Sequence, residues 1–206
     1  MSLNWTGPLF KPVRILLIRH GPSAHSTPAW QPISRAGMEQ WRSDYDAAGI
    51  APDSVAPAAV RARVLQADLT VASDLPRAAM SASHLWPDRQ IATSPLFREA
   101  PLRIPSLGGV ALPLALWALC IHARWMIDIA RGRDMTTDVR TRCSEAADWC
   151  VQACRDRGPS SAVAVVTHGV FRRALAGTLI ERGWSMEGRR SYAPWSVWEL
   201  ASTHSA

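Results

Sequence analysis

Three short aliphatic runs stand out along the chain, and each one ends in polar or turn-forming residues. They occupy residues 14–18, 69–72 and 162–167 and consist mainly of Val, Ile, Leu and Ala. A continuous apolar run of this length is typical of a strand that is buried on both faces of a parallel sheet. We therefore predict three central strands, with weaker outer strands at Ile91 and at residues 197–200.

Helical segments alternate with these runs. Ser34 is suited to cap a helix, Pro76 fits the first turn of another, and Gly158 followed by Pro159 stops a third. After His168, apolar residues recur at every fourth position, as in a helix with one buried face. Four helices are therefore predicted: residues 34–48, residues 76–85, a segment from 136, 137 or 138 to 157, and a segment after His168. This alternation indicates an α/β fold with a mostly parallel central sheet.

Residues 100–135 interrupt the alternation. They contain prolines and a pair of glycines, followed by an apolar helix in which Trp117, Ile121 and Trp125 recur at four-residue spacing. We predict that this segment is an insertion within a single domain that spans residues 1–206. The aromatic stripe could cover a neighbouring site, pack against the core or meet another subunit. Polar residues divide its apolar part, so we predict no membrane span.

The composition favours a globular domain with an anionic ligand. The chain has 206 residues, 48% of them hydrophobic, and a formal charge of +6. All its basic residues except Lys11 are arginines, and arginine suits bidentate contacts to phosphate or carboxylate. General compositional bias is the alternative explanation for this excess. The arginines are scattered rather than gathered in one basic run with aromatics, so we expect no nucleic-acid partner.

The four cysteines do not form a metal-binding or disulfide pattern. There is no pair spaced as CxxC, and Cys150 and Cys154 lie four apart in a predicted helix. We interpret the cysteines as small buried apolar residues and predict no metal. The N-terminus lacks a basic stretch followed by an apolar run, which argues against secretion. Together these features predict a cytoplasmic protein.

Chemically useful side chains follow the predicted strands. Arg19 and His20 come after the first strand, Ser73 and Asp74 after the second, and His168 after the third. Ligands bind outside the carboxyl ends of strands in an open parallel sheet. These residues, together with Arg77 in the next helix and Glu99 after a weaker strand, are therefore expected to converge at one edge of the sheet.

The same residues lie in four ordered motifs that resemble the histidine phosphatase superfamily, the phosphoglycerate mutase-like family. The motifs span roughly residues 13 to 180 and read as follows: LLIRHG at 16–21, ISRAGMEQ at 33–40, ASDLPRA at 72–78 and VVTHG at 165–169. The resemblance implies a three-layer α/β/α fold. Within such a fold we predict that the insertion of residues 100–135 covers the active site, and we expect it to determine substrate choice.

The resemblance implies a role for each matching residue. His20 is expected to be the nucleophile that becomes phosphorylated, and Glu99 stands where the family has its proton donor. The expected site comprises catalytic His20, Glu99 and His168, phosphate-binding Arg19, Arg77 and His168, and candidate substrate contacts Ser23, His25 and Arg103. No cofactor is expected. We interpret Arg172 and Arg173 as surface charges, as Arg103 also could be, although all three could extend an anion pocket.

Independent chemical reasons support these roles. A phosphoryl group in transfer spreads charge over three oxygens, so fixed cations stabilise it strongly. A histidine nucleophile must attack as the neutral imidazole, and its other ring nitrogen should then donate to a backbone carbonyl. The turn at Gly21 and Pro22 could supply that carbonyl.

Two departures favour hydrolysis over mutase activity. Ser26 stands where mutases of this family carry Asn, and the residues after Glu99 lack their Gly-rich sequence. We therefore predict a metal-independent phosphomonoesterase that acts through phosphohistidine on a small-molecule phosphoester or a phosphoprotein. A mutase-type phosphoryl transferase and a non-catalytic phospholigand-binding protein remain the alternatives, and a homo-oligomer is left open.

Overall fold

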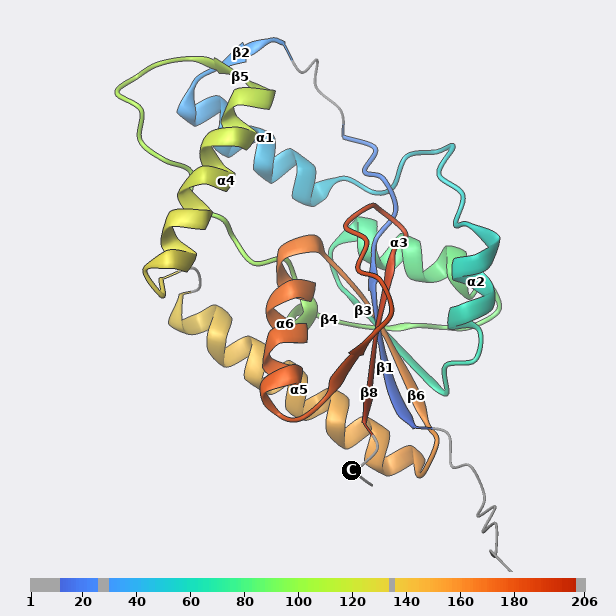
Figure 1. Cartoon of the computed structure of the whole chain (residues 1–206). Helices are drawn as coiled ribbons and strands as arrows, with labels where there is room; N and C mark the ends of the chain where they lie inside the picture. Colours follow the sequence, from blue (N-terminus) through green and yellow to red (C-terminus); the bar gives the residue numbers. More distant parts are fainter. Residues whose placement is uncertain (1–11, 26–29, 134–135, 203–206) are drawn as a thin grey trace, which may run out of the picture.

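A six-stranded sheet runs through the middle of the molecule in the order β4-β3-β6-β1-β8-β7 (Figure 1). The structure is a computed structural model that describes residues 12–25, 30–133 and 136–202. The strands of the sheet are β1 (Val13–Arg19), β3 (Leu69–Ser73), β4 (Ala92–Ser94), β6 (Ala162–Thr167), β7 (Ser185–Glu187) and β8 (Val197–Ser202). β4, β3, β6 and β1 pair parallel with their neighbours in this order, whereas β8 pairs antiparallel with β1 and β7 pairs antiparallel with β8. The prediction of a mostly parallel sheet is confirmed.

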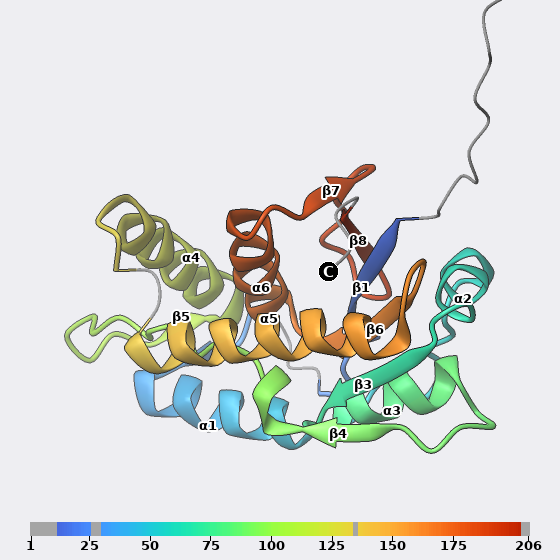
Figure 2. The same ribbon diagram turned by 90° about the horizontal axis from the view of Figure 1, so that it is seen from below.

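Helices cover both faces of the sheet, which confirms the three-layer α/β/α arrangement (Figures 1 and 2). α5 (Thr137–Arg157) and α6 (Gly169–Glu181) pack on one face, where they meet Ile15 and Leu17 of β1. α2 (Ala58–Val64) and α3 (Pro76–Leu85) pack on the other face, against Leu16 and Ile18. Successive side chains of a strand point to opposite faces, so a double-sided core requires an unbroken apolar run. All six residues of β6 are accordingly buried.

The predicted helix boundaries rest on specific contacts. The Ser34 hydroxyl accepts from the backbone N–H of Gly37 at the start of α1 (Arg35–Ala47), and Thr136 caps α5 in the same way. Pro76 is the first residue of α3. Gly158 ends α5 with a φ of 87°, a left-handed conformation that glycine adopts without a steric penalty.

Several short elements lack a sequence signal long enough to predict. They are α2, the 3-10 helix η1 (Pro95–Phe97), β7, and the two-residue strands β2 (Pro32–Ile33) and β5 (Leu112–Pro113). β2 pairs antiparallel with β5 although about 80 residues separate them. Such pairings are decided by tertiary contacts rather than by local periodicity.

The apolar helix of the predicted insertion is α4 (Leu114–Ala130), and it packs against α1 rather than against the sheet. Trp117 and Ile121 are buried with Met38 of α1, and the Trp117 Nε1–H donates to the carbonyl of Ile33 at 2.9 Å. Trp125 lies instead under the guanidinium of Arg173 on α6. The aromatic stripe therefore contributes to packing inside this chain.

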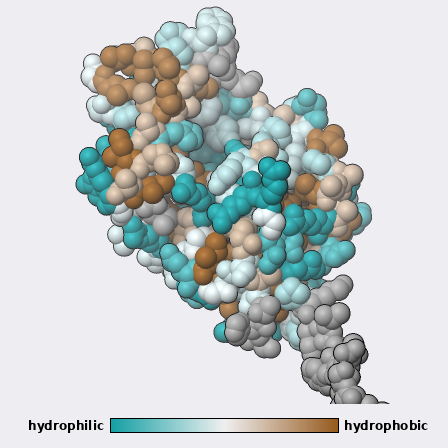
Figure 3. Space-filling model, viewed as in Figure 1, coloured by the Kyte–Doolittle hydropathy of each residue, from teal (hydrophilic) through white to brown (hydrophobic). Residues whose placement is uncertain are grey.

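α4 exposes large apolar side chains, among them Leu119 and Met126. Figure 3 shows hydrophobic surface gathered in the region of the molecule where Figure 1 places this helix. In the described residues no helix has the length and apolar character that a membrane span requires.

Three of the four cysteines, Cys143, Cys150 and Cys154, are buried and all four are free thiols, as expected for small apolar residues.

Gly21, just after β1, generates a prediction about stability because the indole of Trp195 occupies the space next to its Cα. An added Cβ would lie 2.5 Å from Trp195 Cζ2 and 2.9 Å from Ser54 Oγ. Gly21→Ala should therefore lower the free energy of unfolding by about 1–3 kcal/mol, measured by urea denaturation. Gly177 of α6 is the control, because no atom lies within 4 Å of its added Cβ. Gly177→Ala should raise stability by up to about 1 kcal/mol, and equal behaviour of both variants would refute the steric explanation.

Candidate active site

The register of the sheet brings the ends of β1, β3 and β6 level with one another. Arg19 pairs with Thr167, and the next residue of each strand is a histidine. The rings of His20 and His168 consequently lie 5.1 Å apart between centroids. Both are almost fully buried, His20 at 3% and His168 at 0% exposure. The predicted convergence at this sheet edge is confirmed for the two histidines.

His20 is held in one tautomer by its neighbours. Its Nδ1 lies 2.6 Å from the carbonyl oxygen of Gly21, and because a carbonyl can only accept, Nδ1 carries the proton. Nε2 therefore keeps its lone pair, which accepts from the Nε–H of Arg77 at 3.3 Å. Burial, together with the guanidinium groups of Arg77 and Arg19, lowers the pKa of His20 to about 3 against the opposing effect of the Gly21 carbonyl. The imidazole is neutral at physiological pH.

Arg77 is fixed at all three of its nitrogens. Besides the bond to His20, Nη1 donates to the carbonyl of Tyr45 and Nη2 to Oδ1 of Asp46, each at 2.9 Å. The guanidinium also lies over the Tyr45 ring at 4.3 Å and is only 1% exposed. Sequence reasoning missed Asp46, because a single acidic residue near the end of a helix carries no motif.

Among the described residues, the buried nitrogens without a hydrogen-bond partner include Nε of Arg19, Nδ1 of His168 and Nε of Arg172. The other ring nitrogen of His168 lies 2.9 Å from the Ser73 hydroxyl, and Nη1 of Arg19 donates to the carbonyl of Tyr192. Burial lowers the pKa of His168 well below its usual value. Unpaired buried polar atoms are costly, so a cluster of them next to a cation indicates a site for an anionic ligand.

Arg172 is fully buried, which corrects its interpretation as a surface charge. It donates to the carbonyl oxygens of Ser191 and Ser196, and its guanidinium lies 4.3 Å from the centroid of the Trp198 ring. The helical spacing after His168 could have revealed this, since position 172 lies four residues after the buried His168 and four before the buried Ala176. Burial and the nearby Arg19 lower the pKa of Arg172 to about 10, so it stays charged near neutral pH. Arg173 is exposed, as predicted.

Glu99 lies at the N-terminus of α6. Its Oε1 accepts from the backbone N–H groups of Phe171 at 2.8 Å, of Val170 at 3.1 Å and of Ala100 at 3.0 Å. Burial raises the pKa of this carboxyl group, whereas the three N–H donors and Arg77 lower it, and burial has the larger effect. Glu99 can therefore hold a proton at a higher pH than an ordinary glutamate while remaining within electrostatic range of Arg77.

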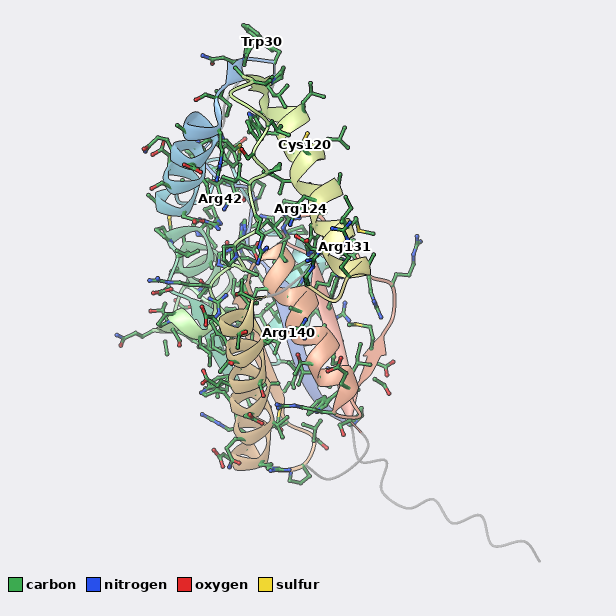
Figure 4. The ribbon with its side chains drawn as sticks, turned by 90° about the vertical axis from the view of Figure 1, so that its left-hand side faces the viewer. Trp30, Arg42, Cys120, Arg124, Arg131 and Arg140 are labelled. Atoms are coloured by element: carbon green, nitrogen blue, oxygen red, sulfur yellow. The ribbon has the colours of Figure 1, made fainter. Side chains whose placement is uncertain are left out.

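The three candidate substrate contacts lie in different surroundings. The Ser23 hydroxyl accepts from the backbone N–H of His25, whose ring packs on Trp41 of α1 at 5.3 Å. Arg103 lines a small pocket with residues from the C-terminal half of α4, including Asp128. Figure 4 shows the same region of α4, with Arg124 and Arg131 labelled. Substrate contact by these residues stays a prediction, and Ser26 lies outside the described residues.

A family model for the histidine phosphatase superfamily (branch 1) matches residues 15–205. The chain belongs to this superfamily. Its motif residues His20, Arg77 and His168 are those that the fold brings together at the carboxyl edge of the sheet. No curated protein sequence matched the chain.

Solved structures of other histidine phosphatase-like proteins share the fold. A phosphoserine phosphatase from Entamoeba histolytica in complex with 3-phosphoglyceric acid superposes with a TM-score of 0.57 at 14% identity, covering 93% of this chain and 98% of that one. A mycobacterial hydrolase gives a TM-score of 0.56 at 21% identity, with 94% and 99% covered. A mycobacterial glucosyl-3-phosphoglycerate phosphatase gives 0.51 at 24% identity, with 94% and 99% covered. The likeness extends over nearly the whole chain and establishes the phosphoglycerate mutase-like fold.

The buried His20 of this histidine phosphatase should remain neutral across the physiological range. We expect its ring signals in two-bond ¹H–¹⁵N correlation spectra to keep the Nδ1–H pattern from about pH 8 down to about pH 5, because its pKa is about 3. The signals are assigned by their loss in His20→Gln. A titration with its midpoint inside that range would contradict the proposed protonation state.

Proposed function

We propose that this histidine phosphatase is a metal-independent phosphomonoesterase that works through a phosphohistidine at His20. One observation carries the proposal: the Nδ1–H bond to Gly21 leaves the lone pair on Nε2, where it accepts from the Nε–H of Arg77 and so lies directly beside a fixed cation. A neutral, oriented imidazole beside a fixed cation is what attack on a phosphate ester requires.

In the first step, Nε2 of His20 attacks phosphorus and the bond to the ester oxygen breaks. The phosphoryl oxygens are bound by Arg77 and by the unpaired Nε–H of Arg19, with His168 alongside. Protonated Glu99 gives its proton to the departing alkoxide, which leaves as an alcohol. The Nε–H of Arg77 then turns from the consumed lone pair of His20 to a phosphoryl oxygen.

In the second step, water attacks the phosphorus of phosphohistidine. Glu99, now ionised, takes a proton from the water, the N–P bond breaks and its electron pair returns to Nε2. Inorganic phosphate and neutral His20 are released, so the cycle needs neither a metal nor a redox group. In the described residues, no group of three or more His, Cys, Asp and Glu side chains is arranged to hold a metal ion.

The substrate is a phosphorylated small molecule or a phosphoprotein, and the segment 100–135 is proposed to select it. This segment carries α4, which packs against α1. α1 in turn carries Tyr45 and Asp46, which accept hydrogen bonds from Arg77. The free state of all four cysteines supports the proposal of a cytoplasmic location.

His20→Ala should abolish the hydrolysis of para-nitrophenyl phosphate, with kcat falling more than roughly 10³-fold because no other group can form the covalent intermediate. The assay contains EDTA, which should leave wild-type turnover unchanged. His84→Ala is the matched control, since His84 is exposed on α3 and bonds only to its own helix. Residual turnover in His20→Ala, or loss of wild-type activity in EDTA, would refute the mechanism. Release of free phosphate rather than a new ester separates hydrolysis from mutase-type transfer.

Glu99→Gln should lower kcat for an alkyl phosphate by about 10²–10⁴-fold, because the departing alkoxide then receives no proton. With para-nitrophenyl phosphate, whose leaving group needs no proton, the variant should release a stoichiometric burst of nitrophenol and then stall. In the wild type, enzyme phosphorylation by the alkyl ester should slow as pH rises through the raised pKa of Glu99. The exposed Glu145 provides the control Glu145→Gln. If kcat falls equally for both esters and no burst of nitrophenol appears, Glu99 is not the proton donor to the leaving group.

A further inference from the structure

The carboxylate of Asp46 forms an ion pair with Arg77, the arginine that contacts the proposed nucleophile. Oδ1 of Asp46 lies 2.9 Å from Nη2 of Arg77, and the carbonyl of the preceding Tyr45 accepts from Nη1 at the same distance. Two consecutive residues of α1 thus hold the outer edge of the guanidinium. None of the four sequence motifs and no part of the proposed reaction uses Asp46.

These contacts decide which edge of Arg77 faces His20. A guanidinium has five N–H donors in a rigid plane, and its two Nη groups are the usual fork for binding an anion. Because Tyr45 and Asp46 bind both Nη groups, the Nε edge is the one that points to His20 Nε2. One N–H on each Nη remains available to phosphoryl oxygens. Without Asp46, the plane could rotate and offer a different set of donors.

The end of α1 is itself firmly placed. Met38 is buried in the cluster that α1 shares with Trp117 and Ile121 of α4. One helical turn before Tyr45, the ring of Trp41 stacks on the Tyr45 ring at 5.2 Å with an interplanar angle of 16°. The position of Asp46, in the last turn of α1, is therefore set by the packing of this helix.

Asp46 also changes the charge that a phosphate meets. Arg77 and Arg172 are buried cations and Arg19 is a third nearby, whereas both histidines are neutral. Among the described residues, Asp46 is the one carboxylate in an ion pair with any of these three arginines. Its side chain is 43% exposed, so its charge is only partly screened by water. It must weaken the attraction of Arg77 for dianionic phosphate, which is both the reacting group and the product.

We infer that Asp46 is a positioning residue for Arg77 whose negative charge also limits the affinity of the site for inorganic phosphate. This inference rests on the proposed phosphatase function. Asp46 orients Arg77 through hydrogen bonding and speeds product release through its charge. The two effects can be separated, because an amide retains the accepting oxygen and loses the charge.

The test compares two substitutions of Asp46 with a control on the same helix. Asp46→Asn should bind inorganic phosphate about threefold to tenfold more tightly in isothermal titration calorimetry, with a lower KM and with kcat/KM no lower than that of the wild type. Asp46→Ala also loses the accepting oxygen, so its kcat/KM should fall about tenfold or more. Asp44→Asn is the control, because Asp44 is exposed on α1 and accepts from Gln40 instead of Arg77. Asp44→Asn removes one negative charge from the protein, as Asp46→Asn does, but leaves the partner of Arg77 in place.

If Asp46→Asn binds phosphate no more tightly than Asp44→Asn does, the charge of Asp46 does not limit phosphate affinity and that part of the inference is overturned. A kcat/KM of Asp46→Ala equal to that of Asp46→Asn would overturn the positioning role. Circular dichroism and thermal unfolding establish that each variant is folded before these comparisons. If the wild type hydrolyses no ester, the proposed function fails, whereas the calorimetric comparison still measures the effect of Asp46 on phosphate binding.

Discussion

The hydrogen bond between Nδ1 of His20 and the carbonyl of Gly21 determines what the rest of the site can do. It assigns the ring proton to one nitrogen and leaves the other with a lone pair aimed at Arg77. The bond depends on the turn after β1, where Gly21 leaves room for the indole of Trp195 because it has no Cβ. The carbonyl of the next residue in the chain thus fixes the tautomer of one imidazole. Burial and the neighbouring guanidinium groups of Arg77 and Arg19 then keep that imidazole neutral, because both lower its pKa.

Concentrating cations in a buried site costs stability, and the fold meets this cost with neutral acceptors. Arg172 has no carboxylate partner in the ion pairs of the described residues and is held by backbone carbonyls and the face of Trp198. Arg19 uses the carbonyl of Tyr192 in the same way. Carbonyl dipoles stabilise a guanidinium without cancelling its charge, so the positive potential remains available to a phosphate. An arrangement of paired salt bridges would have been better compensated but would have attracted anions less strongly.

Local patterns predicted the central strands, the major helices and the convergence of His20 with His168, because each depends on a short apolar run followed by a turn. The sheet register adds what the sequence leaves open, namely that β1 and β6 are neighbours with Arg19 level with Thr167. The partners of Arg77 could not be predicted in this way. Asp46 and Tyr45 reach Arg77 through the packing of α1, and position 172 was misinterpreted because arginine is usually exposed. The motif residues were accessible from sequence, whereas the groups that orient them were not.

The packing of α1 links the two halves of the site. One end of this helix is joined to α4 through Met38 and Trp117, and the other reaches Arg77 through Tyr45 and Asp46. A helix is stiff along its axis, so a displacement of α4 against α1 would be transmitted to the plane of the Arg77 guanidinium. The segment proposed to select the substrate and the residues that bind Arg77 are therefore connected through one helix. Under the proposal that α4 contacts the substrate, a poorly fitting substrate would be penalised in the chemical step as well as in binding, because the phosphoryl donors of Arg77 would be misaligned.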